Sequence, residues 1–211
     1  IYPEFLPNKY QAINQINLKT QLANELKKHP EINFLDLTQT LIEGKSEQQM
    51  FLKNDNHWTD YAANLAQYKL SQKLKQLFPN NITPQLKPWS DFIHVQSHTG
   101  DLEQINGTID LFPDTRKLPD FELCATTLLP GSKHQSNVFA TDCGKPLKAL
   151  VFRDSFFSNL QPFVSEHLGL SYFVWQKMSF ETAEKHILIN QPNVVIEEWV
   201  DRHLPSLYPP Q

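Results

Sequence analysis

The sequence lacks several features that would assign a function at once. It has no apolar run long enough to cross a membrane, and its formal net charge of −4 gives no general attraction to nucleic acid or anionic lipid. Internal repeats and low-complexity tracts are also missing. No signal peptide stands at the start, and the chain opens on Ile1 instead of methionine. We therefore expect a mature or trimmed chain, for which an upstream signal or anchor stays an open alternative.

The size and composition of the chain suit one globular domain. Its 211 residues are enough to bury a real core, and 40% hydrophobic and 20% charged residues are ordinary values for a folded protein. We therefore predict a single domain over residues 1–211. Because the charge balance is slightly acidic, we expect no nucleic acid as a partner.

Cysteine is scarce as well, with only Cys124 and Cys143 in the chain. The segment between them is polar and turn-rich, so a bridge would stabilise the protein by about 3 kcal/mol through the loop that it closes. A disulfide would also indicate an oxidising compartment. Two unrelated free thiols in a cytosolic protein are the alternative.

Hydrophobic spacing predicts four elements in the first part of the chain. Residues 8–28 have apolar side chains at roughly helical intervals, and residues 59–77 form a clear amphipathic helix that ends before a Pro-Asn-Asn turn. The short apolar runs 32–37 and 49–53 are typical of strands.

The second part predicts a parallel sheet after a long irregular stretch. Residues 80–145 are rich in Pro, Asp, Asn and Thr, and we interpret them as an irregular insertion with short strands. Continuous apolar runs then follow at 147–152, 170–176 and 193–199, separated by segments of helix length. Buried strands that alternate with helices indicate an α/β fold, with a mainly parallel central sheet covered on both faces.

The stretch KNDNHWTDY, residues 53–61, raises the first chemical question. Asp55 and His57 stand two positions apart where an extended run gives way to a helix, so their side chains are expected on the same side of the backbone. A carboxylate beside an imidazole fixes the ring tautomer and raises its basicity. The pair therefore offers two members of a catalytic triad.

A nucleophile for this pair follows the strand predicted at 147–152. Ser155 stands where a buried strand leaves the sheet, which is where α/β proteins bind ligands. A helix start nearby would favour an oxyanion. Alone, Asp154 and Ser155 more commonly cap a helix, but Asp55, His57 and Ser155 together match orienting acid, base and nucleophile.

Four stretches resemble one known family: LKNDNHWTDYAA, TGDLEQ, VFRDSFFSNLQPF and PNVVIEEWVDRHL. They are similar to the SGNH-like O-acetyltransferases of exopolysaccharides, the alginate O-acetyltransferase (AlgJ and AlgX, DHHW-type) group. The D-x-H-W motif followed much later by D-S-F is the most specific part. The resemblance implies an SGNH hydrolase-like three-layer α/β/α fold in which Asp55, His57 and Ser155 match the family triad.

The same resemblance implies a function. We expect an O-acetyltransferase that moves acetyl groups through a serine acyl-enzyme to hydroxyls of an extracytoplasmic polysaccharide, without a cofactor or a metal. The acetyl donor would come from a membrane acyltransferase partner. The location would be the periplasm, with an inner-membrane anchor upstream of Ile1. A carbohydrate acetylesterase, with water as acceptor, and a catalytically silent polysaccharide-binding or assembly module are the alternatives.

Two departures from the family accompany the match. Arg153 stands where SGNH proteins commonly have glycine before Asp-Ser, so a tight glycine turn cannot be assumed there, although an arginine can itself stabilise an anion. Family members also continue upstream of IYPEFLP with another strand, so the sheet is expected to be one strand short here.

Further candidates surround the triad, each with a structural alternative. Trp58 suits a sugar platform or core packing. Gly100 and Asp101 resemble an active-site loop of the family or form an ordinary turn. Arg202 resembles a family arginine near the site, or pairs with a neighbouring glutamate.

Two histidines in HVQSH, His94 and His98, have a spacing that would suit a metal site on a helix. Their surroundings look like strand or loop, and no Glu motif accompanies them. We interpret both as surface histidines.

Overall fold

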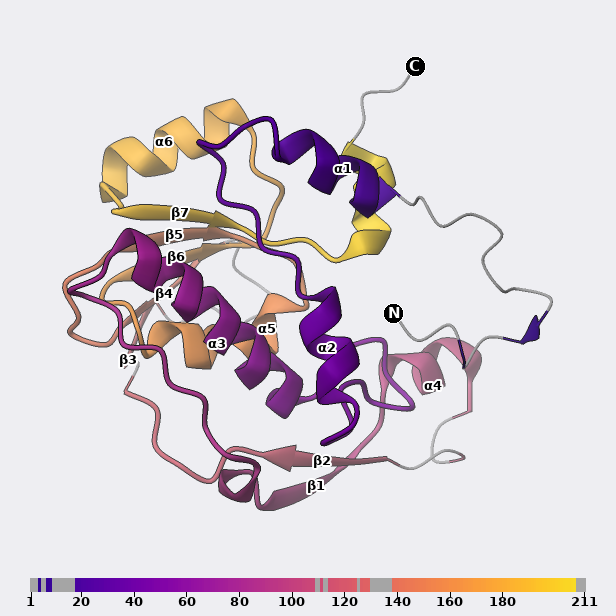
Figure 1. Cartoon of the computed structure of the whole chain (residues 1–211). Coiled ribbons are helices and arrows are strands. Elements are labelled where there is room, and N and C mark those ends of the chain that lie inside the picture. The colour runs from indigo at the N-terminus through magenta and orange to yellow at the C-terminus, as the bar shows by residue number, and fades with distance from the viewer. Residues whose placement is uncertain are drawn as a thin grey trace.

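The computed structural model describes residues 18–108, 114–124, 126–129 and 138–207, together with positions 4, 7, 8 and 111. A central sheet of five strands, in the order β3-β4-β6-β5-β7, organises this part of the chain (Figure 1). The strands are β3 (Thr126–Leu129), β4 (Val138–Asp142), β5 (Ala149–Phe152), β6 (Ser171–Val174) and β7 (Val194–Glu197).

The three strands predicted near the end of the chain form the parallel part of this sheet. β5 lies between β6 and β7 and pairs with both in parallel, with Phe152 opposite Val174 on one side and Glu197 on the other. β4 and β3 extend the sheet beyond β6 in antiparallel orientation. The predicted α/β class with a mainly parallel sheet is thus confirmed.

Helices cover both faces of the sheet. In Figure 1, α3 (Asp60–Leu77) and α5 (Phe157–Ser165) lie on one side and α6 (Phe180–Asn190) on the other. A strand in a sheet that is covered on both faces must be apolar on both sides. Strand β5 meets this requirement, since all four of its residues are buried. Ala149 and Val151 belong to the large cluster on the α3 and α5 side, while Leu150 and Phe152 belong to a smaller cluster that Ala183 of α6 joins. The three-layer arrangement follows from this alternation.

Helix α3 starts immediately after the Asp55–His57 segment. Thr59 caps it, its hydroxyl accepting a hydrogen bond from the backbone N–H of Ala62 at 3.2 Å. The buried stripe that was expected from the sequence includes Ala62, Leu65 and Ala66. The helix predicted over 59–77 is confirmed. Because it begins three residues after His57, its first turn fixes the position of the segment that carries this histidine.

The two strands predicted near the N-terminus do not form. Residues 33–37 have no regular structure and lead into α2 (Thr38–Gly44), while the run 49–53 contributes only an isolated bridge between Phe51 and Trp58. The Thr59 N–H donates to Met50 O at 2.9 Å and the Leu52 N–H to His57 O at 3.3 Å, so this run pairs with residues just across a tight turn and not with the sheet. Of the helix predicted over 8–28, the described part is α1 (Leu18–Leu26), and residues 9–17 lie outside the described residues.

The stretch predicted as an irregular insertion, 80–145, contains regular structure. Its first part holds η3 (Trp89–Asp91), α4 (Asp101–Asn106) and an antiparallel pair of strands, β1 (His94–His98) and β2 (Asp114–Leu118). A bidentate ion pair between Arg116 of β2 and Asp60 joins this pair to the start of α3. Its second part returns to the central sheet as β3 and β4. Short strands were expected in this stretch and are present, but strands this short and mixed carry little hydrophobic periodicity, so the sequence did not give their bounds or their pairing.

A disulfide joins Cys124 and Cys143, with their Cα atoms 5.3 Å apart, as expected for a paired rather than a free arrangement. The bridge links the chain just before β3 to the chain just after β4. At the end of α5, the Glu166 carboxylate accepts a hydrogen bond from the Cys124 backbone N–H. None of the helices in the described part of the chain is long and apolar enough to cross a membrane.

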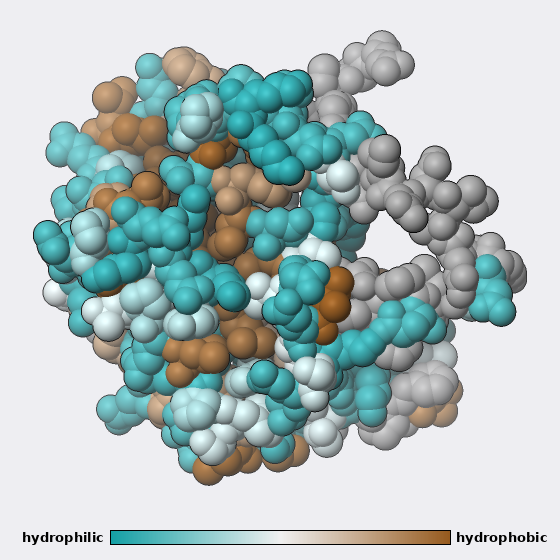
Figure 2. Space-filling view, viewed as in Figure 1, coloured by the Kyte–Doolittle hydropathy of each residue, from teal (hydrophilic) through white to brown (hydrophobic). Residues whose placement is uncertain are grey.

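The outer face of α6 is unusually apolar. Phe180 is 84% exposed, Leu188 71% and Ile189 68%, and none of the helix's residues is buried. Figure 2 shows the hydrophobic residues gathered over this helix at the upper left. The α6 layer is therefore a thin cover, and most of the core lies between the sheet and the α3–α5 pair.

Candidate active site

Three side chains from two distant segments form one hydrogen-bonded chain. Asp55 Oδ1 accepts hydrogen bonds from the His57 ring at Nδ1, 2.6 Å away, and from the His57 backbone N–H at 2.9 Å. The other ring nitrogen, Nε2, lies 2.8 Å from Ser155 Oγ. With Nδ1 donating to the carboxylate, the Nε2 lone pair faces the serine hydroxyl, as a general base requires.

The local geometry differs from the one the spacing suggested. Residues 53–57 form a succession of bends rather than an extended strand. Asp55 reaches His57 because its carboxylate accepts the backbone N–H two residues on, which is an Asx turn. The same carboxylate oxygen then holds the ring, so a tight turn replaces strand alternation as the reason that the two groups meet.

Asp55 is held by a second histidine. His98, at the end of β1, hydrogen-bonds through Nε2 to Asp55 Oδ2 at 2.8 Å. Burial alone would raise the pKa of Asp55, but the hydrogen bonds from the His57 ring and backbone and from His98 outweigh it and hold the pKa below the ordinary value. The interpretation of His98 as a surface histidine is therefore wrong. His94, at the other end of β1, is exposed as expected.

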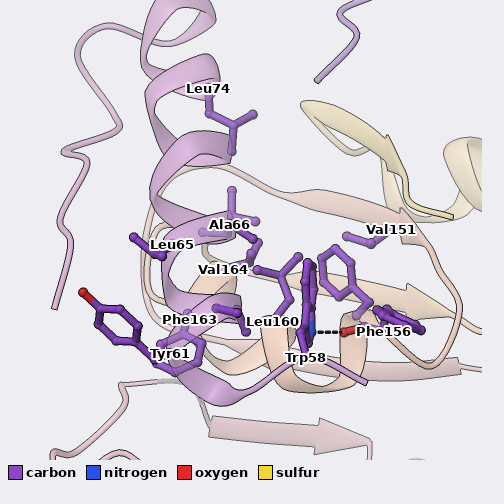
Figure 3. Close-up of a cluster of buried hydrophobic side chains, with 14 of the residues drawn as sticks. Trp58, Tyr61, Leu65, Ala66, Leu74, Val151, Phe156, Leu160, Phe163 and Val164 are labelled. Carbon is purple, nitrogen blue, oxygen red and sulfur yellow. Dashed lines mark hydrogen bonds between the residues drawn. The ribbon is translucent and has the colours of Figure 1, made fainter. Parts of the chain in front are cut away.

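Trp58 ties the histidine segment to the serine segment. Its indole N–H donates to the carbonyl of Phe156 at 3.0 Å, as the dashed line in Figure 3 shows. In return, the Asn159 amide donates to the Trp58 carbonyl at 3.1 Å. Because the Trp58 side chain is buried in the core, with only 4% of the residue exposed, its role as a sugar platform is ruled out in favour of core packing.

The turn that carries Ser155 is fixed from below by Asp154. One oxygen of this buried carboxylate accepts from the Phe156 N–H at 2.8 Å, and the other from the Val200 N–H, beyond β7, at 2.9 Å. Asp154 therefore holds an Asx turn ahead of α5 and does not cap the helix, whose N-cap is Phe156 without a side-chain cap. Ser155 is left facing His57. Within the described residues the Ser155 N–H has no acceptor, so it is available to a developing oxyanion.

Glu198 forms an acid pair with Asp154. Its carboxylate oxygen Oε2 accepts from the Asp154 backbone N–H at 3.3 Å, and its own backbone N–H donates to Phe152 O at 2.9 Å. The residue as a whole is only partly covered, but its carboxyl group is enclosed. Burial, together with the nearby charge of Asp154, raises the pKa of Glu198 to about 8. This raised pKa favours the protonated form of Glu198 beside Asp154 at neutral pH.

Arg153 does not take the oxyanion position considered for it. Its guanidinium lies 4.1 Å from the centre of the Trp175 ring and donates to Ser158 Oγ at 2.9 Å and to Asp154 O at 3.1 Å. Burial lowers its pKa to about 10. Through these contacts Arg153 stabilises the turn that carries Ser155. Because its side chain is buried at the end of a strand, its polar groups must be paired inside the fold.

Gly100 and Asp101 belong to the site through contacts with the turn at 54–57. The Leu102 N–H donates to Asn54 O at 3.1 Å, and Asp101 Oδ1 accepts from the Asn56 N–H at 2.8 Å. A Cβ atom at Gly100 would lie 1.8 Å from Asn54 O, so only glycine allows this approach. The two residues, at the start of α4, therefore position the histidine segment.

Arg202 also lies at the site. Its Nη1 donates to Asn56 Oδ1 at 3.0 Å, and its guanidinium lies 5.3 Å from the centre of the Phe156 ring. The neighbouring glutamates have other partners, since Glu197 accepts from Trp199 and Met178 and Glu198 binds Asp154. Arg202 is exposed, so it supplies a positive charge at the surface beside His57 and Ser155.

Three ligand atoms lie close together at Asp55, His57 and Asp101, near enough to hold a cation. The first two residues already hydrogen-bond each other, and Asp101 binds the Asn56 backbone. A metal ion would have to break these hydrogen bonds. The hydrogen-bonded arrangement suits a base and its orienting acid better than a set of metal ligands.

Comparison with known proteins assigns the fold and the family. A family model described as "SGNH hydrolase-like domain, acetyltransferase AlgX" matches residues 1–150. This is more than half of the chain, and it includes Asp55 and His57 but ends before Ser155. The chain belongs to this family. None of the curated proteins compared with the chain matches it.

Solved structures with the same fold extend over the rest of the AlgX-family chain. PatB1 of Bacillus cereus has 16% sequence identity and a TM-score of 0.61, covering 94% of this chain and 78% of its own. A DHHW family protein from Eubacterium siraeum has 14% identity and a TM-score of 0.61, covering 96% and 75%. The O-acetyltransferase domain of Pseudomonas putida AlgJ has 18% identity and a TM-score of 0.58, covering 99% and 75%. These likenesses show the SGNH-like fold expected from the sequence.

The contact between Gly100 and Asn54 leads to a prediction about Gly100→Ala. The added methyl must push the turn at 54–57 away, and a displacement of about 1 Å at a catalytic group costs on the order of 100-fold in rate. We expect hydrolysis of an acetyl ester to fall by that order, measured alongside the melting temperature. Gly169→Ala is the matched control, since its Cβ would lie 2.0 Å from Lys145 O at the far end of the sheet. Equal activity losses per folded molecule in both variants would contradict the positioning role.

The acid pair predicts a pH-dependent stability. The folded-state pKa of Glu198, about 8, lies above its unfolded value of about 4.3, so its stabilising contribution is lost as the pH rises from about 5 through 8. Glu198→Gln cannot ionise, and we expect its melting temperature to gain on that of the wild type over this range. Glu197→Gln, one residue away and exposed, should keep the wild-type profile. Parallel curves for Glu198→Gln and the wild type would refute the assignment.

Proposed function

We propose that this protein is a serine-dependent O-acetyltransferase that modifies hydroxyls of an extracytoplasmic polysaccharide. The observation that carries the proposal is the unbroken chain of hydrogen bonds from Asp55 through His57 to Ser155. Membership of the AlgX acetyltransferase family supports the acetyl group as the cargo. The name of the AlgJ domain, an O-acetyltransferase, supports an oxygen as the acceptor atom.

The first half of the reaction forms an acetyl-enzyme. Ser155 Oγ attacks the carbonyl carbon of the donor ester while His57 Nε2 takes the hydroxyl proton. Asp55 stabilises the ring as it becomes positive. The carbonyl oxygen gains negative charge, which the free Ser155 N–H can accept as a hydrogen bond. When the tetrahedral intermediate collapses, the bond to the donor's leaving oxygen breaks, and that oxygen receives the proton from His57.

The second half repeats the proton path in reverse order. A sugar hydroxyl gives its proton to His57 Nε2 and attacks the acetyl carbonyl. The bond to Ser155 Oγ then breaks, and the serine recovers the proton. The product is an O-acetyl sugar and free enzyme, so each donor acetyl is balanced by one acceptor hydroxyl without a cofactor.

Arg202 is the group best placed to meet the acceptor. It is exposed, it is hydrogen-bonded to Asn56 beside His57, and it lies over Phe156 beside Ser155. A guanidinium donates to sugar hydroxyls and binds a carboxylate in two hydrogen bonds. The net charge of −4 gives no long-range attraction to an acidic polymer, so recognition by Arg202 would be local.

The compartment and the donor complete the proposal. The disulfide between Cys124 and Cys143 suits the oxidising periplasm. We propose a membrane acyltransferase partner as the source of acetyl groups, as the resemblance to the exopolysaccharide O-acetyltransferases implies. Water is the competing acceptor, and an acetylesterase would use the same three side chains. The intact hydrogen-bonded triad argues against a silent binding module, which does not need it.

The test offers the protein an acetyl ester together with neutral and uronate-containing oligosaccharides. We expect acetylated sugar, measured by mass spectrometry, and a loss of at least about 1,000-fold on Ser155→Ala with little change in melting temperature. Ser90→Ala, at an exposed serine, is the control and should match the wild type. Release of acetate without any acetylated sugar would identify the protein as an esterase. If no ester is turned over at all, the remaining alternative is the catalytically silent binding module.

A further inference from the structure

His98 holds the oxygen of Asp55 that His57 leaves free. Its Nε2 lies 2.8 Å from Asp55 Oδ2, while His57 uses Oδ1. The Asp55 side chain is only 10% exposed and that of His98 20% exposed, so water competes little for this contact. Both carboxylate oxygens are therefore bound by imidazoles from different parts of the fold.

The backbone around His98 is anchored to the same turn. The Asn54 amide donates to the His98 carbonyl at 2.7 Å and to Glu103 Oε2 at 3.0 Å. The Gly100 N–H donates to the same glutamate oxygen at 3.3 Å. On the other side, the Lys53 N–H donates to Asp114 Oδ2 at 2.7 Å, and Asp114 is the register partner of His98 in the β1–β2 pair. The strand end is thus built to present His98 to Asp55.

We propose that His98 is a positioning residue for the triad: by donating a hydrogen bond to Asp55 Oδ2, it fixes the carboxylate plane so that Oδ1 meets the His57 ring. The inference rests on the proposed function, because it assigns His98 a part in the reaction at Ser155. A carboxylate held at one oxygen can rotate about its terminal torsion, which is broad. One held at both oxygens cannot, so His57 keeps its tautomer and its aim at the serine.

A second consequence is electrostatic. The donor on Oδ2 offsets part of the charge of Asp55 and so tempers the basicity that this carboxylate gives His57. Without it, His57 would bind a proton more tightly and require a higher pH to act as a base. The charged and titratable groups around this pair come from four elements. His57 in the turn and Asp101 of α4 lie beside each other, and the charge of Arg116 of β2 interacts with Asp55. Glu103 of α4, Asp114 of β2 and Arg202 of η4 (Asp201–Leu207) bind the neighbouring residues Asn54, Lys53 and Asn56.

The experiment measures the pH–rate profile of acetyl ester hydrolysis for three variants of His98. His98→Leu removes the donor, and we expect kcat to fall at least about tenfold, with the acid limb moving up by about half a pH unit or more. His98→Gln carries an amide N–H at a similar reach and should recover most of the rate and the wild-type limb. His98→Asn is equally polar but too short, so it should behave like His98→Leu. His94→Leu, on the same strand but exposed, is the control and should be unchanged.

Wild-type profiles in His98→Leu and His98→Asn would overturn the inference. So would equal losses in the Leu, Asn and Gln variants with an unmoved acid limb, because that pattern reports packing alone. If the wild type neither acetylates a sugar nor hydrolyses an acetyl ester, the proposed function fails, and the inference is tested by proton NMR of the His57 Nδ1–H instead. That resonance should be sharp and far downfield in the wild type and in His98→Gln, and weakened in His98→Leu. An identical signal in all three would overturn it.

Discussion

The hydrogen bond from the Trp58 indole to the Phe156 carbonyl is the constraint on which the site depends. It joins the residue after His57 to the residue after Ser155, so the distance between base and nucleophile is set by groups that do no chemistry. Asn159 closes the connection by donating to the Trp58 carbonyl. A buried indole N–H left without its acceptor would cost about 1–3 kcal/mol, which makes the two segments hard to separate once the core has formed.

The two segments of the site are held by different parts of the fold. The histidine segment is held by the β1–β2 pair and α4, which bind Asp55, Asn54 and Asn56 from outside the central sheet. The serine turn is held by the sheet itself, through Asp154 and Glu198 at the ends of β5 and β7. The two segments also differ in the charge of their buried carboxyl groups. Hydrogen-bond donors lower the pKa of Asp55, so it stays ionised and can stabilise the positive ring of His57. Burial raises the pKa of Glu198, which favours its neutral form beneath the serine turn.

The sequence was sufficient for the elements with long or periodic apolar patterns. It located α3 and the three parallel strands, and the motif chemistry identified Asp55, His57 and Ser155, which the structure brings within hydrogen-bond distance. It failed for β3 and β4, whose short mixed runs carry no clear period, and for 32–37, where apolar residues pack without pairing. It also missed His98, because a hydrogen bond between residues 43 positions apart leaves no local pattern. Only its place just before the TGDLEQ stretch hinted at the site.

Detection of the acetyl-enzyme tests the central claim, that these separate segments form one nucleophilic unit, most directly. The protein would be mixed with an acetyl ester, quenched in acid within the first turnover and digested, and the acetylated peptide would be sequenced by mass spectrometry. The account predicts one acetyl group on Ser155 in the wild type, and none in a His57→Ala protein treated in parallel. Acetyl on another residue, or the same yield on Ser155 without His57, would contradict it.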